Sequence, residues 1–158
     1  MFDMKKILIA ICCLWSFALK AEVIVVDGDS LLIDGRRVRL EGIDAPEYNQ
    51  NCYDANGVMY KCGQKAKEAL AEAVKSGVKC QKMNTDIYQR EVSICYAGKV
   101  NINQQMVRNG WAVAYTRYFP NFALDEENAR KEKRGIWKGR FMRPDLYRAL
   151  ETDKVQHE

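Results

Sequence analysis

Apolar and polar positions alternate with a period of two along the first part of the chain. Val23–Val26 is a β-branched run, Leu31–Ile33 resumes the apolar character, and Arg37–Glu41 alternates polar with apolar residues. Between these segments lie Asp27-Gly28 and Asp34-Gly35, which are typical of tight turns. The pattern therefore predicts three strands joined by two hairpins.

Helical periodicity replaces this alternation further along the chain. Gln64–Val74 carries its apolar residues on one face, and Gly77 follows as a typical helix stop. The other predicted elements are two strands, a short helix capped by Asn101, another strand and a last helix. They span Val78–Met83, Glu91–Tyr96, Asn101–Arg108, Trp111–Tyr115 and Leu124–Arg134. This order favours the α+β class, with one domain built around a small antiparallel barrel.

The first residues differ from the rest of the chain. Lys5 and Lys6 precede an apolar run from Ile7 to Ala18, and small residues follow it. This arrangement predicts a secretory signal peptide, cleaved after Ala18 or Ala21. The alternative is a permanent membrane anchor, but the run is shorter than the roughly 18 to 20 residues that cross a bilayer.

Four cysteines remain once the apolar run is removed: Cys52, Cys62, Cys80 and Cys95. Export to an oxidising compartment favours two disulfides, and four cysteines allow three pairings. We favour Cys52 with Cys62, closing a polar loop, and Cys80 with Cys95, joining two strand-like segments. A four-cysteine zinc site or free thiols are the alternatives, although no two of these cysteines are separated by just two residues.

The charge of the chain is only weakly basic. Cleavage after Ala21 would remove three of the 25 basic and one of the 21 acidic residues, so the net charge would fall from +4 to +2. Basic residues nevertheless gather in the C-terminal third. They are Arg130, Lys131, Lys133, Arg134, Lys138, Arg140 and Arg143. A solvated helix face and a phosphate-binding patch explain this cluster equally well.

Two short segments, Asp27–Ser30 and Arg39–Glu47, together contain five carboxylates and one arginine. The single histidine is His157, next to the last residue. Serine, cysteine or zinc chemistry that depends on an imidazole inside the fold is therefore excluded. Any reaction here must use carboxylates and arginines, with or without an oxygen-liganded metal.

Asp29 and Asp44 each follow a predicted strand at a turn. If the two strands pair, both carboxylates can converge on one cation, with the Ala45 carbonyl as a third oxygen. Such hard ligands favour Ca²⁺ or Mg²⁺, with water and substrate completing the shell. The alternative for Asp27-Gly28-Asp29 alone is an ordinary hairpin turn.

Glu47 stands three residues beyond Asp44, so one carboxylate can hold metal while the other takes a proton as a general base. Arg39 should point away from the core, and Arg90 ends an exposed connection. Two guanidinium groups can donate hydrogen bonds to phosphate oxygens. They can also stabilise the negative charge that grows in a transition state with five-coordinate phosphorus. Taken singly, Glu47 is a loop or capping residue and each arginine is a surface residue; together, without histidine, the set suits phosphodiester hydrolysis.

These residues resemble the thermonuclease family of secreted staphylococcal-nuclease-like enzymes. The family pattern matches Asp27-Gly28-Asp29-Ser30, then Arg39, then Asp44-Ala45-Pro46-Glu47. A second motif is similar to Asp86-Ile87-Tyr88-Gln89-Arg90, and the resemblance extends over about Val23 to Trp137. It divides the chain into a signal peptide (1–21), a nuclease domain (22–143) and a C-terminal tail (144–158).

The resemblance implies a five-stranded OB-fold β-barrel with three α-helices. It also implies a Ca²⁺-dependent, monomeric endonuclease that cleaves DNA and RNA and leaves 3′-phosphate ends. The roles carried over by position are calcium binding by Asp29, Asp44 and the Ala45 carbonyl, water activation by Glu47, phosphate binding by Arg39 and Arg90, and a nucleotide pocket lined by Tyr88 and Tyr115.

The chain departs from the family pattern in a few places. Ser30 replaces a threonine, Ile87 stands where a basic residue is common, and the connection from Ile33 to Arg39 is short. These differences concern substrate preference and affinity. The competing interpretation is a non-catalytic OB-fold that binds nucleic acid, since a fold alone does not imply hydrolysis.

Overall fold

A computed structural model describes residues 21–116 and 120–156; the predicted signal peptide up to Lys20 and His157 lie outside these ranges. The described strands are β1 (Val23–Val25), β2 (Ser30–Ile33), β3 (Arg36–Leu40), β4 (Ile43–Asp44), β5 (Cys52–Tyr53), β6 (Met59–Tyr60), β7 (Lys79–Thr85), β8 (Glu91–Ala97), β9 (Val100–Asn101) and β10 (Val113–Ala114). The α-helices are α1 (Cys62–Val74), α2 (Ile102–Arg108), α3 (Ala123–Lys131) and α4 (Pro144–Gln156), with 3₁₀ turns at Pro120–Phe122 and Gly135–Lys138.

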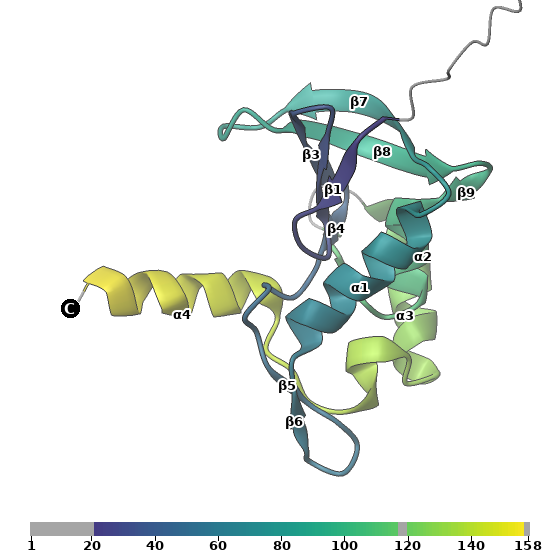
Figure 1. Ribbon diagram of the computed structural model, residues 1–158. Helices are drawn as coiled ribbons and strands as arrows, with labels where there is room; N and C mark the ends of the chain where they lie inside the picture. Colours follow the sequence, from purple (N-terminus) through teal and green to yellow (C-terminus); the bar gives the residue numbers. More distant parts are fainter. Residues whose placement is uncertain (1–20, 117–119, 157–158) are drawn as a thin grey trace, which may run out of the picture.

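The main sheet has the strand order β1-β2-β3-β8-β7, with β9 paired to β8. The first three strands form the two predicted hairpins, and Ser30 lies opposite Arg39 in the β2–β3 register. Helices α1, α2 and α3 lie together on one side of this curled sheet (Figure 1). The α+β class is therefore confirmed.

Three details differ from the sequence-based expectation. The barrel is not purely antiparallel, because β3 and β8 pair in parallel after a long crossover that contains α1 and β7. The polar loop before α1 contains the small β5–β6 hairpin. The described residues also contain four α-helices rather than three, because α4 occupies the predicted tail. Its Leu146 and Leu150 are exposed, so this helix has no buried apolar stripe from which it could be predicted.

The core lies between the sheet and the first two helices. The sheet contributes Leu31, Ile33, Val38 and Leu40, and the helices contribute Ala66, Leu70, Ile102, Met106 and Val107. Val38 and Leu40 are buried, as the alternation predicts, and Arg39 lies on the other side of β3. The core thus holds β3, the strand that carries Arg39, against its neighbours.

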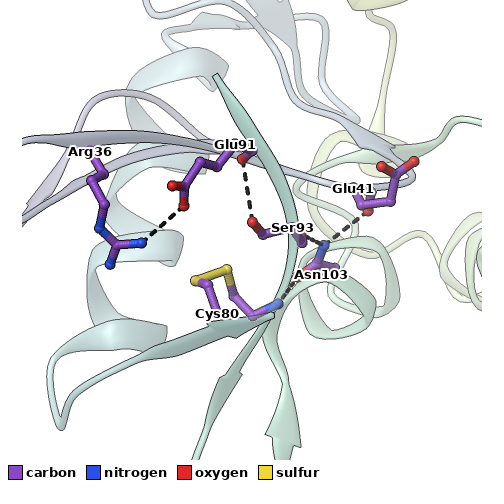
Figure 2. Close-up of a disulfide and its surroundings, with 7 residues drawn as sticks. Arg36, Glu41, Cys80, Glu91, Ser93 and Asn103 are labelled. Carbon is purple, nitrogen blue, oxygen red and sulfur yellow. Dashed lines mark hydrogen bonds and ion pairs between the residues drawn. A yellow bond between two sulfur atoms is a disulfide. The ribbon is translucent and has the colours of Figure 1, made fainter. Parts of the chain in front are cut away.

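The buried amide of Asn103 connects three parts of the fold. Its Oδ1 accepts a hydrogen bond from Cys95 N (3.0 Å), and its Nδ2 donates to Ser93 O (3.0 Å) and Glu41 O (2.9 Å) (Figure 2). This side chain ties α2 to β8 and to the chain just before β4. The backbone at Glu41, shortly before Asp44, is therefore held by a hydrogen bond from the buried Asn103 side chain.

Both favoured disulfides are present in the structure. Cys52 pairs with Cys62, which ties β5 to the first residue of α1, and Cys80 pairs with Cys95 across β7 and β8. The second pair lies at directly opposite positions of the antiparallel register. These bonds exclude the alternatives of a zinc site and of free thiols for this structure.

The acidic first turn of α3 joins this helix to α2 and β10. Asp125 binds Gln104 Nε2 (2.8 Å) and Arg108 Nε (3.0 Å) on α2, and Glu126 accepts the backbone N–H of Ala114 on β10. Both carboxylates are buried. They join elements to one another, in addition to any effect on the helix dipole.

Candidate nuclease site

Asp29 lies in the turn before β2, where its carboxylate organises the local backbone. Its Oδ2 accepts the N–H of Ala45 (2.7 Å) and its Oδ1 accepts the hydroxyl of Ser30 (2.9 Å). The side chain of Asp27 accepts Asp29 N (3.0 Å), and burial raises the pKa of Asp27 above its ordinary value. Asp29 is only 3% exposed. Its desolvated carboxylate lies next to Ala45, the residue that follows Asp44.

Asp44 ends β4 and is 1% exposed. Antiparallel pairing with β10 sets it opposite Val113. The backbone N–H of Ala45, the residue after Asp44, is hydrogen-bonded to Asp29. This bond holds Asp29 and Asp44 on neighbouring segments although 15 positions separate them in the sequence.

Arg39 stands between these two carboxylates. Its Nη1 forms an ion pair with Asp29 Oδ1, while its Nη2 donates to Asp44 Oδ1 (3.0 Å) and to Ile43 O (3.2 Å). The side chain is 19% exposed. Burial lowers the pKa of Arg39 below its ordinary value, although the charge of Asp44 acts in the opposite direction. The structure therefore brings Asp29, Arg39 and Asp44 together.

Arg90 lies just before β8, directly after a tight turn. Asp86 Oδ1 accepts the N–H groups of Tyr88 and Arg90 (both 2.9 Å), and its Oδ2 accepts Arg90 Nε (2.7 Å). Tyr88 is 63% exposed, with the Arg90 guanidinium 5.4 Å from its ring centroid. Asp86 thus sets the direction of the arginine.

A cavity of about 420 Å³ opens between these elements. It is lined by Arg39, Asp44, Asp86, Arg90, Tyr115 and Arg148, among others. Both predicted phosphate-binding arginines, Arg39 and Arg90, therefore line this cavity. The predicted nucleotide-binding residue Tyr115 lines it as well. Tyr88 is not among the lining residues; its ring lies next to the Arg90 guanidinium instead.

Glu47 lies just outside this cavity. Its backbone is fixed by Gln50, which donates its N–H to Glu47 O (2.7 Å) and accepts Glu47 N at Oε1 (3.2 Å). The side chain lines a neighbouring cavity of about 390 Å³ that also contains Tyr48, Tyr147 and Arg148. The predicted base is close to Asp44 in space, but Arg148 stands at the boundary between the two cavities.

Arg148 is the site residue that sequence reasoning missed. It lies on α4, in the predicted tail, and its Nη1 donates to Asp44 Oδ1 (2.9 Å) and to Glu47 Oε1 (2.8 Å), while its Nη2 donates to Asp44 Oδ2 (3.0 Å). Burial acts to lower the pKa of Arg148, but these hydrogen bonds outweigh it and raise that pKa. One basic residue among many in this region gives no local signal of such a contact.

The chemistry of the aspartate pair fits a hard divalent cation. Both carboxylates are desolvated, and both form ion pairs with guanidinium groups, so the site attracts positive charge. Within residues 21–116 and 120–156 no group of three or more His, Cys, Asp or Glu side chains could hold a metal. Asp29 and Asp44 would therefore offer a cation two carboxylates, and water and substrate oxygens would have to complete its shell.

Comparison with known proteins agrees with this geometry. Residues 37–139 match the family described as staphylococcal nuclease homologue. An uncharacterized endonuclease of Haemophilus influenzae is 37% identical over 121 residues, which are 72% of this chain and 62% of that protein. An uncharacterized endonuclease of Escherichia coli O157:H7 is 34% identical over 120 residues, 72% of each chain. The succinoglycan biosynthesis protein ExoI of Rhizobium meliloti is 33% identical over 120 residues, 72% of this chain and 62% of that protein.

The matched fold, the aspartate pair and the two arginines define a nuclease-like OB-fold domain. The chain belongs to the staphylococcal nuclease homologue family. The OB-fold expectation is thereby confirmed, although the main sheet has six strands rather than the expected five. The matched segment spans about 62% of the length of the Rhizobium and Haemophilus relatives.

Proposed function

We propose that this protein is a Ca²⁺-dependent endonuclease that hydrolyses phosphodiester bonds of DNA and RNA and leaves 3′-phosphate ends. The observation that carries the proposal is that Arg39 forms ion pairs with both Asp29 and Asp44. Arg39 and Asp44 line a cavity that Arg90 also lines. Two buried acids and two arginines suit a phosphodiester, which carries one negative charge and gains another in the transition state. Membership of a nuclease family supports the same reaction.

In this proposal the chain's own residues position the phosphate and move a proton. Asp29, Asp44 and the Ala45 carbonyl hold Ca²⁺, which supplies positive charge next to the scissile phosphate when bound. Arg39 and Arg90 donate hydrogen bonds to phosphate oxygens, and Tyr88 and Tyr115 contact the nucleotide. Glu47 takes a proton from the water molecule whose oxygen attacks phosphorus. The bond from phosphorus to O5′ breaks and O5′ takes up a proton from solvent water, which leaves a 3′-phosphate and a 5′-hydroxyl.

We also propose that the protein acts as a monomer after export. The sequence pattern of residues 1–21 and the two disulfides support export, because disulfides persist in oxidising compartments. None of the helices within the described ranges has the length and apolar character that crossing a bilayer requires.

The direct test is a cleavage assay of the purified mature protein on single-stranded DNA, duplex DNA and RNA. We expect all three to be cut with Ca²⁺, no cutting in excess EGTA, and recovery when Ca²⁺ is restored. The products should carry 5′-hydroxyl ends that a polynucleotide kinase can label without prior dephosphorylation. Full activity in excess EGTA would reject the calcium role, and nucleic-acid binding without cleavage would favour the non-catalytic interpretation.

A further inference from the structure

Helix α4 brings a third arginine into the site from an element that projects away from the fold. Pro144 at its start is buried, whereas Arg148 and the residues from Ala149 to Asp153 are exposed. Figure 1 shows α4 extending away from the sheet and from α1–α3, with the C-terminus at its far end. Arg148 is the residue of α4 that reaches Asp44 and Glu47.

The contacts of Arg148 use the oxygens that the proposed reaction needs. Its two terminal nitrogens bind both carboxylate oxygens of Asp44 in the bidentate geometry that arginine forms with carboxylates. The same Nη1 also binds Glu47 Oε1. Asp44 Oδ1 accepts Arg39 Nη2 as well, so Asp44 already faces two guanidinium groups.

This arrangement is incompatible with the working state of the site. A divalent cation at Asp44 needs a carboxylate oxygen that Arg148 now occupies, and a positive guanidinium at 2.9 to 3.0 Å repels it. Glu47 in turn cannot offer Oε1 freely to water while it holds Arg148. Arg148 also lines both cavities, so it stands between the proposed base and the cavity that contains Arg39 and Arg90.

We propose that Arg148 is an internal competitor of the divalent cation at Asp44, and that α4 thereby sets the Ca²⁺ concentration at which the site opens. Cation binding displaces the guanidinium from Asp44 and frees Glu47. This inference rests on the proposed function, because it assumes that Asp44 binds Ca²⁺. The Arg148 side chain is 43% exposed, so it can exchange Asp44 for water without leaving a buried charge unpaired.

The test measures Ca²⁺ binding without nucleic acid, by isothermal titration calorimetry with the metal alone. Arg148 is half-exposed while Asp44 is buried, so removing this competing charge in Arg148→Ala should make Ca²⁺ bind about fivefold more tightly than in the wild type. Arg143→Ala is the matched control, because Arg143 faces Glu126 and Asp145 and contacts neither Asp44 nor Glu47. The control should keep the wild-type affinity, and Asp44→Ala should abolish binding.

A second readout uses the wild-type protein, so it does not depend on the folding of a variant. Hydrogen–deuterium exchange of residues 144–153 should increase when Ca²⁺ is added, and should be independent of Ca²⁺ in Arg148→Ala. Equal Ca²⁺ affinities for wild type and Arg148→Ala would overturn the inference alone. Unchanged Ca²⁺ affinity with weaker binding of a nucleoside bisphosphate would instead make Arg148 a phosphate-binding residue. Absence of Ca²⁺ binding in every form would refute the calcium role and this inference together.

Discussion

At the scale of single residues, Asp86 determines how Arg90 is presented to the cavity. Its two oxygens accept hydrogen bonds from Tyr88 N, Arg90 N and Arg90 Nε. Partial burial acts to raise the pKa of Asp86, but hydrogen bonds from Arg90 and Tyr88 and the charge of Arg90 hold it below its ordinary value of 3.8. A carboxylate whose folded pKa is lowered adds stability above its unfolded pKa and loses it as the pH falls through the folded value.

Asp86→Asn should therefore reduce the free energy of unfolding at pH 7 by about 1 kcal/mol or less, since the pair is partly solvated. The amide oxygen still accepts the backbone N–H groups, so the turn should keep its shape. The difference between wild type and variant should disappear as the pH falls below 3.8 and through the lowered pKa of Asp86. Denaturant unfolding at several pH values checks this, and a difference that stays constant down to pH 2 would contradict it.

How far the sequence predicts the site depends on sequence distance. Asp29, Arg39, Asp44 and Glu47 lie in one segment whose turns and strands are locally encoded, so their proximity is predictable. Arg148 reaches Glu47 across 101 positions, and nothing in the local pattern around it distinguishes it from a solvated arginine. Contacts of this kind follow from tertiary packing rather than from periodicity.

At the scale of elements, the start of α1 sets the position of the Glu47 backbone. A Cβ on Gly63 would lie 1.8 Å from Glu47 O, so only glycine allows the helix to approach this loop. The disulfide between Cys52 and Cys62 fixes the same helix end to β5. The loop that carries the proposed base is therefore held by a close backbone contact.

Gly63→Ala should push the Glu47 backbone away from its place. We expect a loss of about 1 to 3 kcal/mol in stability from overpacking, and a marked loss of turnover at saturating Ca²⁺ and substrate. Gly57→Ala is the control, since Gly57 has a φ of +78° but no atom within 4 Å of an added Cβ. It should lose about 1 kcal/mol from backbone strain with unchanged turnover. Equal turnover in the two variants would show that this contact does not position Glu47.

Element types were more predictable than their pairing. Apolar periodicity predicts the hairpins of β1 to β3 and the helices α1 and α2, because each buries one face against the core. The parallel partnership of β3 and β8 depends on a crossover between distant segments, which periodicity does not report. Helix α4 was not predicted because Leu146 and Leu150 are exposed and form no buried apolar stripe.

At the scale of the whole molecule, one rigid framework supports a site assembled from many segments. The core and the Asn103 network fix β3, β8 and the approach to β4, and the two disulfides fasten β5 to α1 and β7 to β8. The framework holds the two aspartates and the backbone of the loop that carries Glu47, while the third arginine, Arg148, comes from the projecting α4. This division favours a site whose phosphate-binding residues are held in place, while the contact from α4 can change.

The central claim is that Glu47 is the base of a phosphodiester hydrolysis, and Glu47→Gln tests it most directly. Cleavage of single-stranded DNA at saturating Ca²⁺ should fall by about 10²- to 10⁴-fold, while Ca²⁺ and nucleotide binding persist. Glu68→Gln, an exposed change on α1 that removes the charge of an ion pair with Lys65, should retain wild-type turnover. Turnover in Glu47→Gln equal to that of the wild type would contradict the claim.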